Sequence, residues 1–283
     1  MNLVVFGLGY TAQAFVRRVG PRCREVVGTV RSPDKAAALA RDGLTVRCLP
    51  GEEGRLEADL AAADALLVSV PPDEAGDPVL ARFRAAIAAA PRLGWIGYLS
   101  TVGVYGDHGG AWVDAGTPAR PSGARGRRRL AAEEAWLALG QESGKPVQVF
   151  RLAGIYGPGR SAFDRLAAGA KRVVKPGQVF NRIHVDDIAA VLEASLARPR
   201  AGAVYDVADD EPAPSSDVLG YAAALLGQEP PPEIPIEEAG LSPMARSFWD
   251  GNKRVRNSLL RDELGVTLAY PTYREGLRAL LPG

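Results

Sequence analysis

The sequence predicts an α/β fold in which a doubly wound parallel sheet carries helices on both faces. Two observations support this prediction. Short apolar runs alternate with longer helical patterns over most of the first 155 residues, and the first apolar run leads through a glycine-rich turn into a helix. Strands and helices in this repeating order build a parallel sheet, because parallel strands need a crossover segment between them.

The predicted elements follow one another along the chain. Strands are expected at the buried apolar runs LVVFG, EVVGTV, LTVRC, ALLVSV, GWIGYLS and PVQVFRLAG. Helices are expected at residues 11–19, from residue 33, at residues 77–90 and over about 18 residues after residue 121. Further on, FNRIHVDDIAAVLEASLA predicts a loop followed by a helix, and GAVYDVAD predicts one more strand.

The composition excludes several classes of protein. A formal charge of +1, from 34 basic and 33 acidic residues, gives no field that would attract a nucleic acid. No apolar run approaches the roughly 20 residues that cross a bilayer. Two cysteines and two histidines offer no metal-ligand spacing. We therefore expect a cytoplasmic chain with no membrane or nucleic-acid partner and no metal.

The segment GLGYTA at residues 7–12 is the G-x-G-x-x-A form of the dinucleotide fingerprint. Gly7 permits the tight turn, Gly9 lets the backbone approach a pyrophosphate, and Ala12 lets helix and strand pack closely. Tyr10 and Thr11 lie between Gly9 and Ala12, and the N-terminus of the predicted helix presents free N–H groups, which favour anions. These five residues are expected to bind a dinucleotide, and the alternative is a tight turn without a ligand.

The end of the second predicted strand indicates which dinucleotide is bound. An NAD site has Asp or Glu there, about 20 residues after the fingerprint, whereas this chain has Thr29. Arg31 and Ser32 follow, with Lys35 one helical turn further. A guanidinium beside a hydroxyl suits a 2′-phosphate, so we expect NADP(H) rather than NAD(H). In the alternative, Arg31 faces solvent and Ser32 caps the helix. The cofactor role and the capping role can hold at once.

Four segments in order along the chain resemble a known superfamily. They are GLGYTA, LSTVGVYG at 99–106, RLAGIYGPG at 151–159 and RIHVDDIA at 182–189. The sequence resembles the extended short-chain dehydrogenases/reductases, the NAD-dependent epimerases and dehydratases, which have a Rossmann fold. The resemblance implies that Thr101 polarises a substrate carbonyl or hydroxyl, and that Gly154 and Ile155 contact the cofactor near its nicotinamide. For these last two residues the alternative is a strand-to-loop turn.

The segment PSGARGRRRL at 121–130 departs from that family. Arg125 stands where the family has its acid/base tyrosine, and Arg129 where it has the partner lysine. Arginine stays protonated near neutral pH, so Arg125 cannot abstract a proton. It could instead stabilise an oxyanion, while Arg129 donates to ribose hydroxyls. In the alternative, Arg129 pairs with Glu133 on the helix surface.

Further residues are candidates for binding or catalysis. Tyr105 is the best substitute proton donor, and its alternative role is a packing aromatic. His184 is expected to be structural, with Asp186 or Asp187 capping the next helix. The C-terminal part contains three further candidate cations, Arg246, Lys253 and Arg254. They could bind an anionic substrate, and the alternative is that they are surface charges.

These residues predict an NADP(H)-binding protein of the atypical, YeeZ-like branch, which lacks the Tyr-Lys pair. PPDEAGDPVL at 71–80 and NKRVRNSLL at 252–260 resemble this branch. We expect an atypical oxidoreductase or epimerase acting on a small carbonyl or hydroxyl substrate. The alternative is a non-catalytic NADP(H)-binding sensor or scaffold. Residues 1–156 are expected to form the NAD(P)-binding Rossmann domain and residues 157–283 a small mixed substrate lobe, with some segments returning to the sheet. The family resemblance also implies a possible homodimer.

Overall fold

The computed structural model describes residues 1–281, and the chain divides into two compact units. The sheet unit comprises Met1–Ser100, Arg128–Arg151 and Ile188–Tyr205. The second unit comprises Thr101–Arg127, Leu152–Asp187 and Asp206–Gly283. Each unit is therefore built from segments that are far apart in the sequence. The division at residue 156 into a cofactor domain and a substrate lobe stays a prediction.

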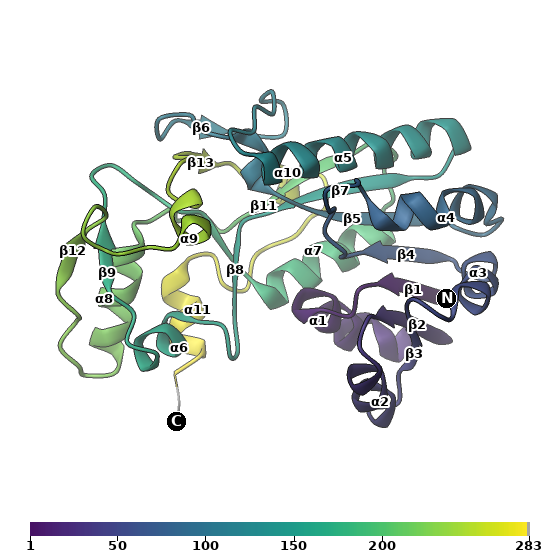
Figure 1. Cartoon of the computed structure of the whole chain (residues 1–283), viewed down its shortest axis with the longest axis horizontal. Coiled ribbons are helices and arrows are strands. Elements are labelled where there is room, and N and C mark those ends of the chain that lie inside the picture. Colours follow the sequence, from purple (N-terminus) through teal and green to yellow (C-terminus); the bar gives the residue numbers. More distant parts are fainter. Residues whose placement is uncertain (282–283) are drawn as a thin grey trace. The chain divides into compact units, whose positions relative to one another are not determined.

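A seven-stranded parallel sheet confirms the predicted fold class (Figure 1). Its strands, in spatial order, are β11 (Val204–Val207), β7 (Val147–Leu152), β5 (Trp95–Thr101), β4 (Ala65–Val68), β1 (Asn2–Phe6), β2 (Glu25–Val30) and β3 (Thr45–Cys48). The chain runs outward from β1 to β3 and then returns to form β4 on the other side of β1. In such sheets ligands bind at the carboxyl ends of the strands beside this reversal.

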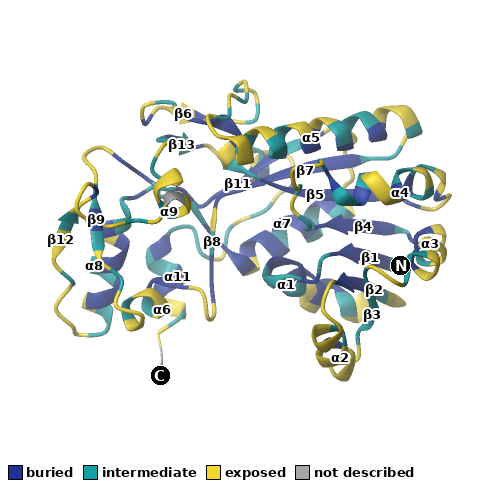
Figure 2. Cartoon of the chain, viewed as in Figure 1, coloured by how far each residue is buried: buried dark blue, intermediate teal, exposed yellow. Residues whose placement is uncertain are grey.

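Helices cover both faces of the sheet. They are α1 (Tyr10–Val19), α2 (Pro33–Arg41), α3 (Glu53–Ala61), α4 (Pro78–Ala89), α5 (Ala124–Ser143) and α7 (Val185–Ala197). Apolar side chains of α3, α4 and α5 share one core with the strands, including Leu60, Phe83 and Trp136. On the other face Trp95 packs against Phe15 of α1, and α7 contributes a serine that accepts from the indole nitrogen. The strands are accordingly buried and the outer helix faces exposed (Figure 2).

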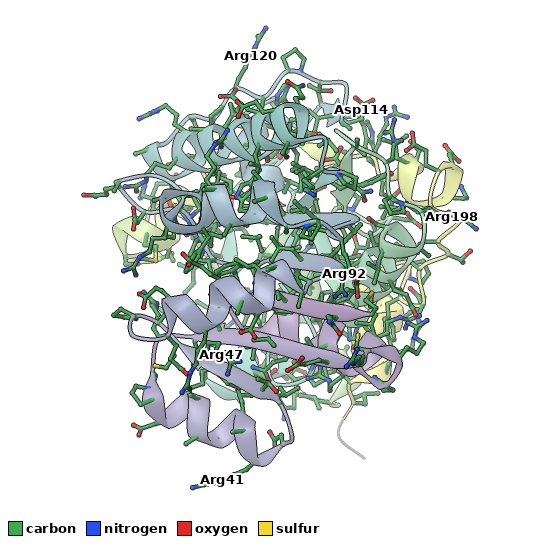
Figure 3. The ribbon with its side chains drawn as sticks, turned by 90° about the vertical axis from the view of Figure 1, so that its right-hand side faces the viewer. Arg41, Arg47, Arg92, Asp114, Arg120 and Arg198 are labelled. Carbon is green, nitrogen blue, oxygen red and sulfur yellow. The ribbon has the colours of Figure 1, made fainter. Side chains whose placement is uncertain are left out.

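Helix α3 is the element that the sequence pattern does not predict. It buries only Leu56 and Leu60, so its apolar stripe is too sparse to be recognised from the sequence. The Arg47 guanidinium pairs with the Asp59 carboxylate, at 2.8 Å and 3.1 Å, and so ties α3 to β3. Figure 3 shows Arg47 inside this layer and Arg41 extending outward from the end of α2.

The second unit contains short elements. Three parallel two-stranded pairs form from β8 (Gly154–Tyr156) with β10 (Arg182–His184), β9 (Arg172–Val174) with β12 (Glu233–Pro235), and β6 (Trp112–Val113) with β13 (Arg254–Val255). Its helices are the short 3-10 helix η2 (Val102–Tyr105), α6 (Ala162–Ala167), α8 (Ser215–Leu225), α9 (Pro243–Ser247), α10 (Ser258–Asp262) and α11 (Tyr273–Ala279). In the sheet unit, a second short 3-10 helix, η1 (Gly20–Arg22), follows α1. Across residues 1–281, helices that combine the length and the apolarity of a membrane span are absent.

Candidate functional site

The glycine-rich turn after β1 is built around Gly7, whose φ of +87° suits only glycine. A Cβ there would also lie 3.0 Å from the Val70 side chain. Thr29, at the end of β2, holds the turn with two hydrogen bonds: the N–H of Gly7 donates to its Oγ1 at 2.9 Å, and the N–H of Leu8 to its backbone oxygen at 3.0 Å. The Leu8 side chain packs over Gly28 of β2, where a Cβ would come within 2.1 Å of it.

Helix α1 begins directly after this turn, and no side chain of the described residues occupies the N–H groups at its N-terminus. Gly9 is the N-cap in extended backbone conformation, no side chain of the described residues caps the helix, and its first turn holds no acidic residue. Apart from Gly9 and its two neighbours in the chain, no heavy atom of the described residues lies within 4 Å of a Cβ built on Gly9. Thr11 and Ala12 are buried against the sheet. The N–H groups of the first turn are therefore open to an anion, as a dinucleotide phosphate requires.

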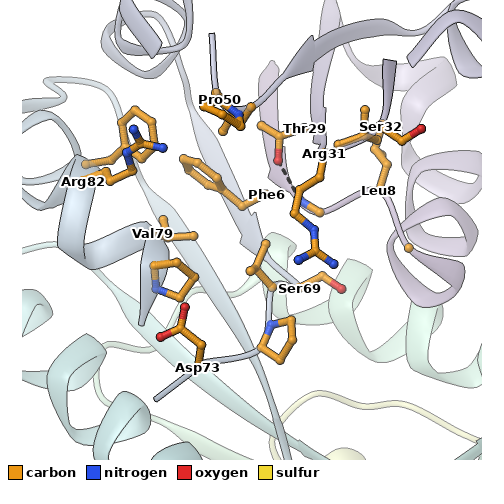
Figure 4. A pocket seen from close by; sticks show the side chains of 18 of the residues that line it. Phe6, Leu8, Thr29, Arg31, Ser32, Pro50, Ser69, Asp73, Val79 and Arg82 are labelled. Atoms are coloured by element: carbon orange, nitrogen blue, oxygen red, sulfur yellow. Dashed lines mark hydrogen bonds between the residues drawn. The ribbon is translucent and has the colours of Figure 1, made fainter. Parts of the chain in front are cut away.

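A cavity of about 650 Å³ opens beside this turn at the carboxyl ends of β1, β2 and β4 (Figure 4). Gly7, Gly9, Arg31 and Ser32 of the predicted cofactor residues line it. Tyr10, Thr11 and Ala12 instead form the first turn of α1. The cavity therefore coincides with the dinucleotide site that the fingerprint predicts.

The cavity is rich in positive charge on its polar side. Arg31 and Lys35 lie after β2, Arg82 lies on α4, and Asp73 is the one carboxylate among the described lining residues. Figure 4 shows the Arg31 guanidinium reaching into the cavity toward Ser69, with Arg82 on the opposite wall. One Asp73 oxygen already accepts from the N–H of Ala75 at 2.8 Å, and Arg82 pairs with Glu53 at 3.0 Å. Arg31 and Lys35 are exposed.

Ser32 performs the capping role that the sequence offered as an alternative. Its Oγ accepts from the N–H of Lys35 at 3.3 Å, and Pro33 occupies the first position of α2. The hydroxyl hydrogen stays available, because capping uses the oxygen only as an acceptor. Capping and ligand contact are therefore compatible at this residue.

The rest of the cavity lining is apolar and was missed from the sequence. It includes Phe6, Leu49, Pro50, Val70, Val79 and Phe83. These residues follow or end strands β1, β3 and β4 or lie on α4, so the rule that ligands bind at carboxyl strand ends would have indicated most of them. Apolar walls of this kind suit an adenine ring.

Arg129, which replaces the family lysine, is bound to strand β5. Its Nη1 donates to the backbone oxygen of Leu99 at 2.7 Å and contacts the Tyr98 hydroxyl at 3.4 Å, and its guanidinium lies 5.8 Å from the centre of the Tyr98 ring. Burial raises the pKa of the Tyr98 hydroxyl, which the Arg129 charge partly offsets. Tyr98 is therefore neutral, and Arg129 keeps further N–H groups that these contacts do not use.

Glu133 does not take the surface pairing with Arg129 that the sequence offered as an alternative. Its side chain is 2% exposed and accepts from Arg151 at 2.8 Å. The Ser100 hydroxyl also donates to it. The reason is that Glu133 faces the sheet, where strands β5 and β7 supply its partners, whereas Arg129 reaches the backbone of β5.

Arg125, which replaces the family tyrosine, is exposed in the second unit. Its guanidinium carbon lies 5.9 Å from the centre of the Phe248 ring, which is itself exposed. Within the described residues Arg125 forms no salt bridge. Its neighbour Arg127 donates to the Ser122 backbone oxygen at 3.2 Å. The Arg125 charge is thus available to a ligand, and its catalytic role stays a prediction.

Thr101 ends β5 and is half-buried. Its Oγ1 accepts from the N–H of Gly103 at 3.1 Å and so starts the short helix η2. Accepting that bond leaves the hydroxyl hydrogen for donation. This geometry is compatible with the predicted contact to a carbonyl oxygen.

Tyr105 lies at the end of η2 and is fully buried. Its hydroxyl lies 2.8 Å and 2.9 Å from the two carboxylate oxygens of Asp206, and 2.8 Å from the backbone oxygen of Asp114. A hydroxyl has one hydrogen to donate, and these acceptors compete for it. The contacts favour the packing alternative over a role as proton donor to a substrate.

Gly154 and Ile155 form strand β8, which pairs in parallel with β10, instead of a strand-to-loop turn. Gly154 is exposed, and a Cβ on it would lie 3.0 Å from the backbone oxygen of Asn181. Both residues belong to the second unit. Their contact with the nicotinamide part of a cofactor stays a prediction.

His184 is buried, as expected of a structural residue. Its Nδ1 accepts from the N–H of Asp186 at 3.2 Å. The Asp187 carboxylate accepts from the N–H groups of Ala269 and Tyr270 at 2.8 Å and 3.0 Å. The histidine is therefore structural, as predicted, and it accepts from the first turn of α7, where an aspartate was expected to cap, while the Asp187 carboxylate binds the C-terminal segment. Within residues 1–281 there is no cluster of three side chains that could hold a metal.

The chain was compared with known families, curated proteins and solved structures. No family model matches it. Protein YeeZ of Escherichia coli K12 is 27% identical over 288 residues, which cover 95% of this chain and 96% of YeeZ. The structure of a functionally unknown conserved protein from Silicibacter pomeroyi DSS is 52% identical, covers 98% of this chain and 97% of that one, and has a TM-score of 0.92.

Two further structures carry descriptions of a function. A proposed NAD-dependent epimerase/dehydratase from Methylobacillus flagellatus is 26% identical, with 99% and 97% of the two chains covered and a TM-score of 0.72. The dTDP-glucose 4,6-dehydratase of Bacillus anthracis, solved with NAD, is 18% identical, with 99% and 95% covered and a TM-score of 0.77, and so shares the fold alone. The structural neighbours of the chain are thus NAD-dependent epimerase/dehydratase proteins of the extended short-chain dehydrogenase/reductase type, and its identity to Protein YeeZ supports the YeeZ-like branch.

Proposed function

We propose that the chain is an NADP(H)-dependent oxidoreductase or epimerase that acts on a small carbonyl or hydroxyl substrate. The observation that carries the proposal is the cationic side of the cavity after β2. Thr29 stands where an NAD site has its carboxylate, and Arg31, Ser32 and Lys35 line the cavity directly after it. A carboxylate accepts from ribose hydroxyls and repels a phosphate, whereas these three residues are donors.

The cavity residues fit the adenosine half of the cofactor. Arg31 would hold the 2′-phosphate through charge-assisted hydrogen bonds, with the Ser32 hydroxyl and the Lys35 ammonium as further donors. The walls made by Leu49, Pro50 and Phe83 suit the adenine ring. The open N-terminus of α1 would hold the pyrophosphate.

The bound cofactor supplies a hydride donor or acceptor. Within the chain, the Thr101 hydroxyl is oriented by Gly103 and can donate to a substrate oxygen. Arg125 carries a charge that can stabilise negative charge on that oxygen but cannot transfer a proton. The proposal therefore assigns electrostatic stabilisation to Arg125 in place of the family's proton relay.

A second candidate function is a non-catalytic NADP(H) sensor. The observation that favours it is the binding of Arg129 to Leu99 and Tyr98, which gives this arginine a structural task. Both candidates require NADP(H) binding, so turnover separates them. Oxidation of NADPH with a panel of carbonyl compounds, lost in Thr101→Ala, supports the enzyme. Tight binding without oxidation across the panel supports the sensor.

Cofactor preference is tested by titrating NADPH and NADH into the purified chain and its variants. Arg31→Ala is expected to weaken NADPH about tenfold to a hundredfold, since a charged hydrogen bond contributes about 1.5–3 kcal/mol, and to leave NADH unchanged. Arg41→Ala is the matched control, because Arg41 is exposed at the C-terminal end of α2, the helix that follows Arg31 (Figure 3). Equal affinity for both cofactors, unchanged in Arg31→Ala, would refute the NADP assignment.

A further inference from the structure

Lys253 is a buried cation in the second unit that the proposed reaction does not use. Its side chain is inside the unit, with the residue 8% exposed, and its Nζ donates to the backbone oxygen of Gly106 at 2.8 Å. Gly106 ends the same short segment that begins at Thr101. The ammonium therefore contacts the loop that carries the residue predicted to orient the substrate.

The Lys253 ammonium lacks a neutralising partner in the described part of the chain. It forms no salt bridge there, and one hydrogen bond leaves two of its three N–H groups. Asp107 is the carboxylate whose charge acts on the Lys253 ammonium. It accepts from the N–H groups of Asn252 and Gly109 at 2.8 Å and 3.2 Å. Burial lowers the pKa of Lys253, and the Asp107 charge offsets this only in part. An anion beside the ammonium would compensate the desolvation.

Gln178 adds an unused acceptor in the same region, since it contacts Gly251, which also lies beside the Lys253 ammonium. The residue is 2% exposed, and its Nε2 donates to the backbone oxygen of Gly251 at 3.0 Å. Its Oε1 is buried and has no hydrogen-bond partner among the described residues. A buried acceptor without a donor is costly, which marks it as a candidate contact for a ligand donor.

Gly251 brings the two groups together. A Cβ on Gly251 would lie 3.4 Å from the Lys253 Nζ and 2.9 Å from the Gly106 oxygen. The same glycine accepts from Gln178 through its backbone oxygen. A side chain at this position would collide with the Gly106 backbone and crowd the ammonium, so only glycine lets the segment pass this close to both.

We propose that Lys253 and Gln178 recognise an acidic hydroxy compound as the substrate of this chain. The Lys253 ammonium binds an anionic oxygen of the substrate, and Gln178 Oε1 accepts from an adjacent hydroxyl. That the bound compound is a substrate rests on the proposed function. The binding site itself rests on the contacts described above. A carboxylate and a phosphate share this chemistry, so the probes must distinguish them.

The test measures the binding of glycerate, glycerol 3-phosphate and glycerol by calorimetry, each with and without saturating NADPH. Glycerate or glycerol 3-phosphate is expected to bind, and glycerol is not. The stronger of the two anions identifies the class of anionic group. Equal binding of glycerol, or no binding by any probe, overturns the inference. Failure of NADPH to bind while an anion still binds contradicts the proposed function alone.

Three variants then locate the site. Lys253→Met and Gln178→Leu are each expected to weaken the bound anion at least about tenfold, since one charged or buried hydrogen bond is lost in each. Both should leave the NADPH dissociation constant unchanged. Lys171→Met is the control, because Lys171 is an exposed lysine of the same unit. If Lys253→Met does not fold, Gln178→Leu decides. Unchanged anion affinity in the folded variants overturns the assignment.

Discussion

Thr29 and Arg31 divide between them two tasks at the end of β2. Thr29 holds the glycine-rich turn by accepting from Gly7, and it contributes no charge. Arg31 is free to present its guanidinium to the cavity. A single acidic residue at this strand end would favour a ribose hydroxyl and disfavour a phosphate. The separation explains how the turn stays anchored although the acid of an NAD site is missing.

The buried pair of Glu133 and Arg151 is expected to dominate the stability of the sheet unit around α5. Glu133→Gln removes the carboxylate that faces Arg151 and should lower the free energy of unfolding by about 3–5 kcal/mol. Glu142→Gln is the control, because its pair with Arg84 is largely exposed and should contribute at most about 1 kcal/mol. Urea unfolding curves of both variants check this, and equal losses would contradict it.

His184 is expected to make stability depend on pH. Burial lowers its pKa below the ordinary 6.5 in the folded chain, and Asp186 opposes this only in part. The unfolded chain therefore binds more protons between that lowered pKa and pH 6.5. The free energy of unfolding should fall with decreasing pH through this window, by at most about 1.4 kcal/mol per pH unit, and be independent of His184 above it.

His184→Asn isolates this contribution. The amide oxygen of asparagine can accept from the N–H of Asp186 as Nδ1 does, but it does not titrate. The variant should be less stable at pH 8, because contacts with the Tyr156 and Tyr270 rings are lost. Its unfolding free energy should also vary less between pH 5 and 6.5. An unchanged slope would show that other groups cause the dependence.

At the scale of elements, α2 combines a structural start with a proposed ligand contact. Ser32→Asp should keep the helix stable, since aspartate is an equally good N-cap and favours the helix dipole. It should weaken NADPH at least about tenfold by repulsion of the 2′-phosphate, while NADH binding is retained. Ser32→Ala is the counterpart: it should cost about 0.5–2 kcal/mol of stability from the lost cap. Cofactor titration and thermal unfolding of the two variants separate the roles.

The element pattern could be predicted where burial dictates it. Strands β1, β4 and β5 are mainly apolar because both faces of the sheet are covered. The N-cap of α2 follows from Ser-Pro chemistry alone. Helix α3 could not be predicted, because its position depends on tertiary contacts such as that of Arg47 with Asp59.

The candidate site shows the same limit. The spacing of Arg129 and Glu133 allowed a pairing on the helix surface as an alternative, but which side of α5 faces the sheet depends on the complete packing. Likewise, Tyr105 is a candidate donor by its motif, and only its contact with Asp206 reveals that its hydroxyl is engaged. The positions of the fingerprint glycines and Arg31 at the cavity were predictable, because they follow from local backbone and sequence position.

For the whole molecule, the cavity depends on four distant segments of the sheet unit: 6–9, 29–35, 49–50 and 69–83. Hydrogen exchange should therefore slow in all four when NADPH binds, because the ligand stabilises the state that it binds. Exchange in the C-terminal part of α7, which does not line the cavity, serves as the internal reference. Protection confined to one segment would contradict a single shared site. A homodimer remains our proposal, which sedimentation of the purified chain can check.

Gly28 illustrates that a residue can be intolerant of substitution without contacting the ligand. The residue lies in the middle of β2 and is absent from the described cavity lining, yet the Leu8 side chain occupies the place of its missing Cβ. Any larger residue at position 28 would displace Leu8 and, with it, the turn between Gly7 and Gly9. A random library selected for loss of cofactor binding should therefore be enriched in substitutions at position 28. The residues that contact the ligand would not explain this enrichment.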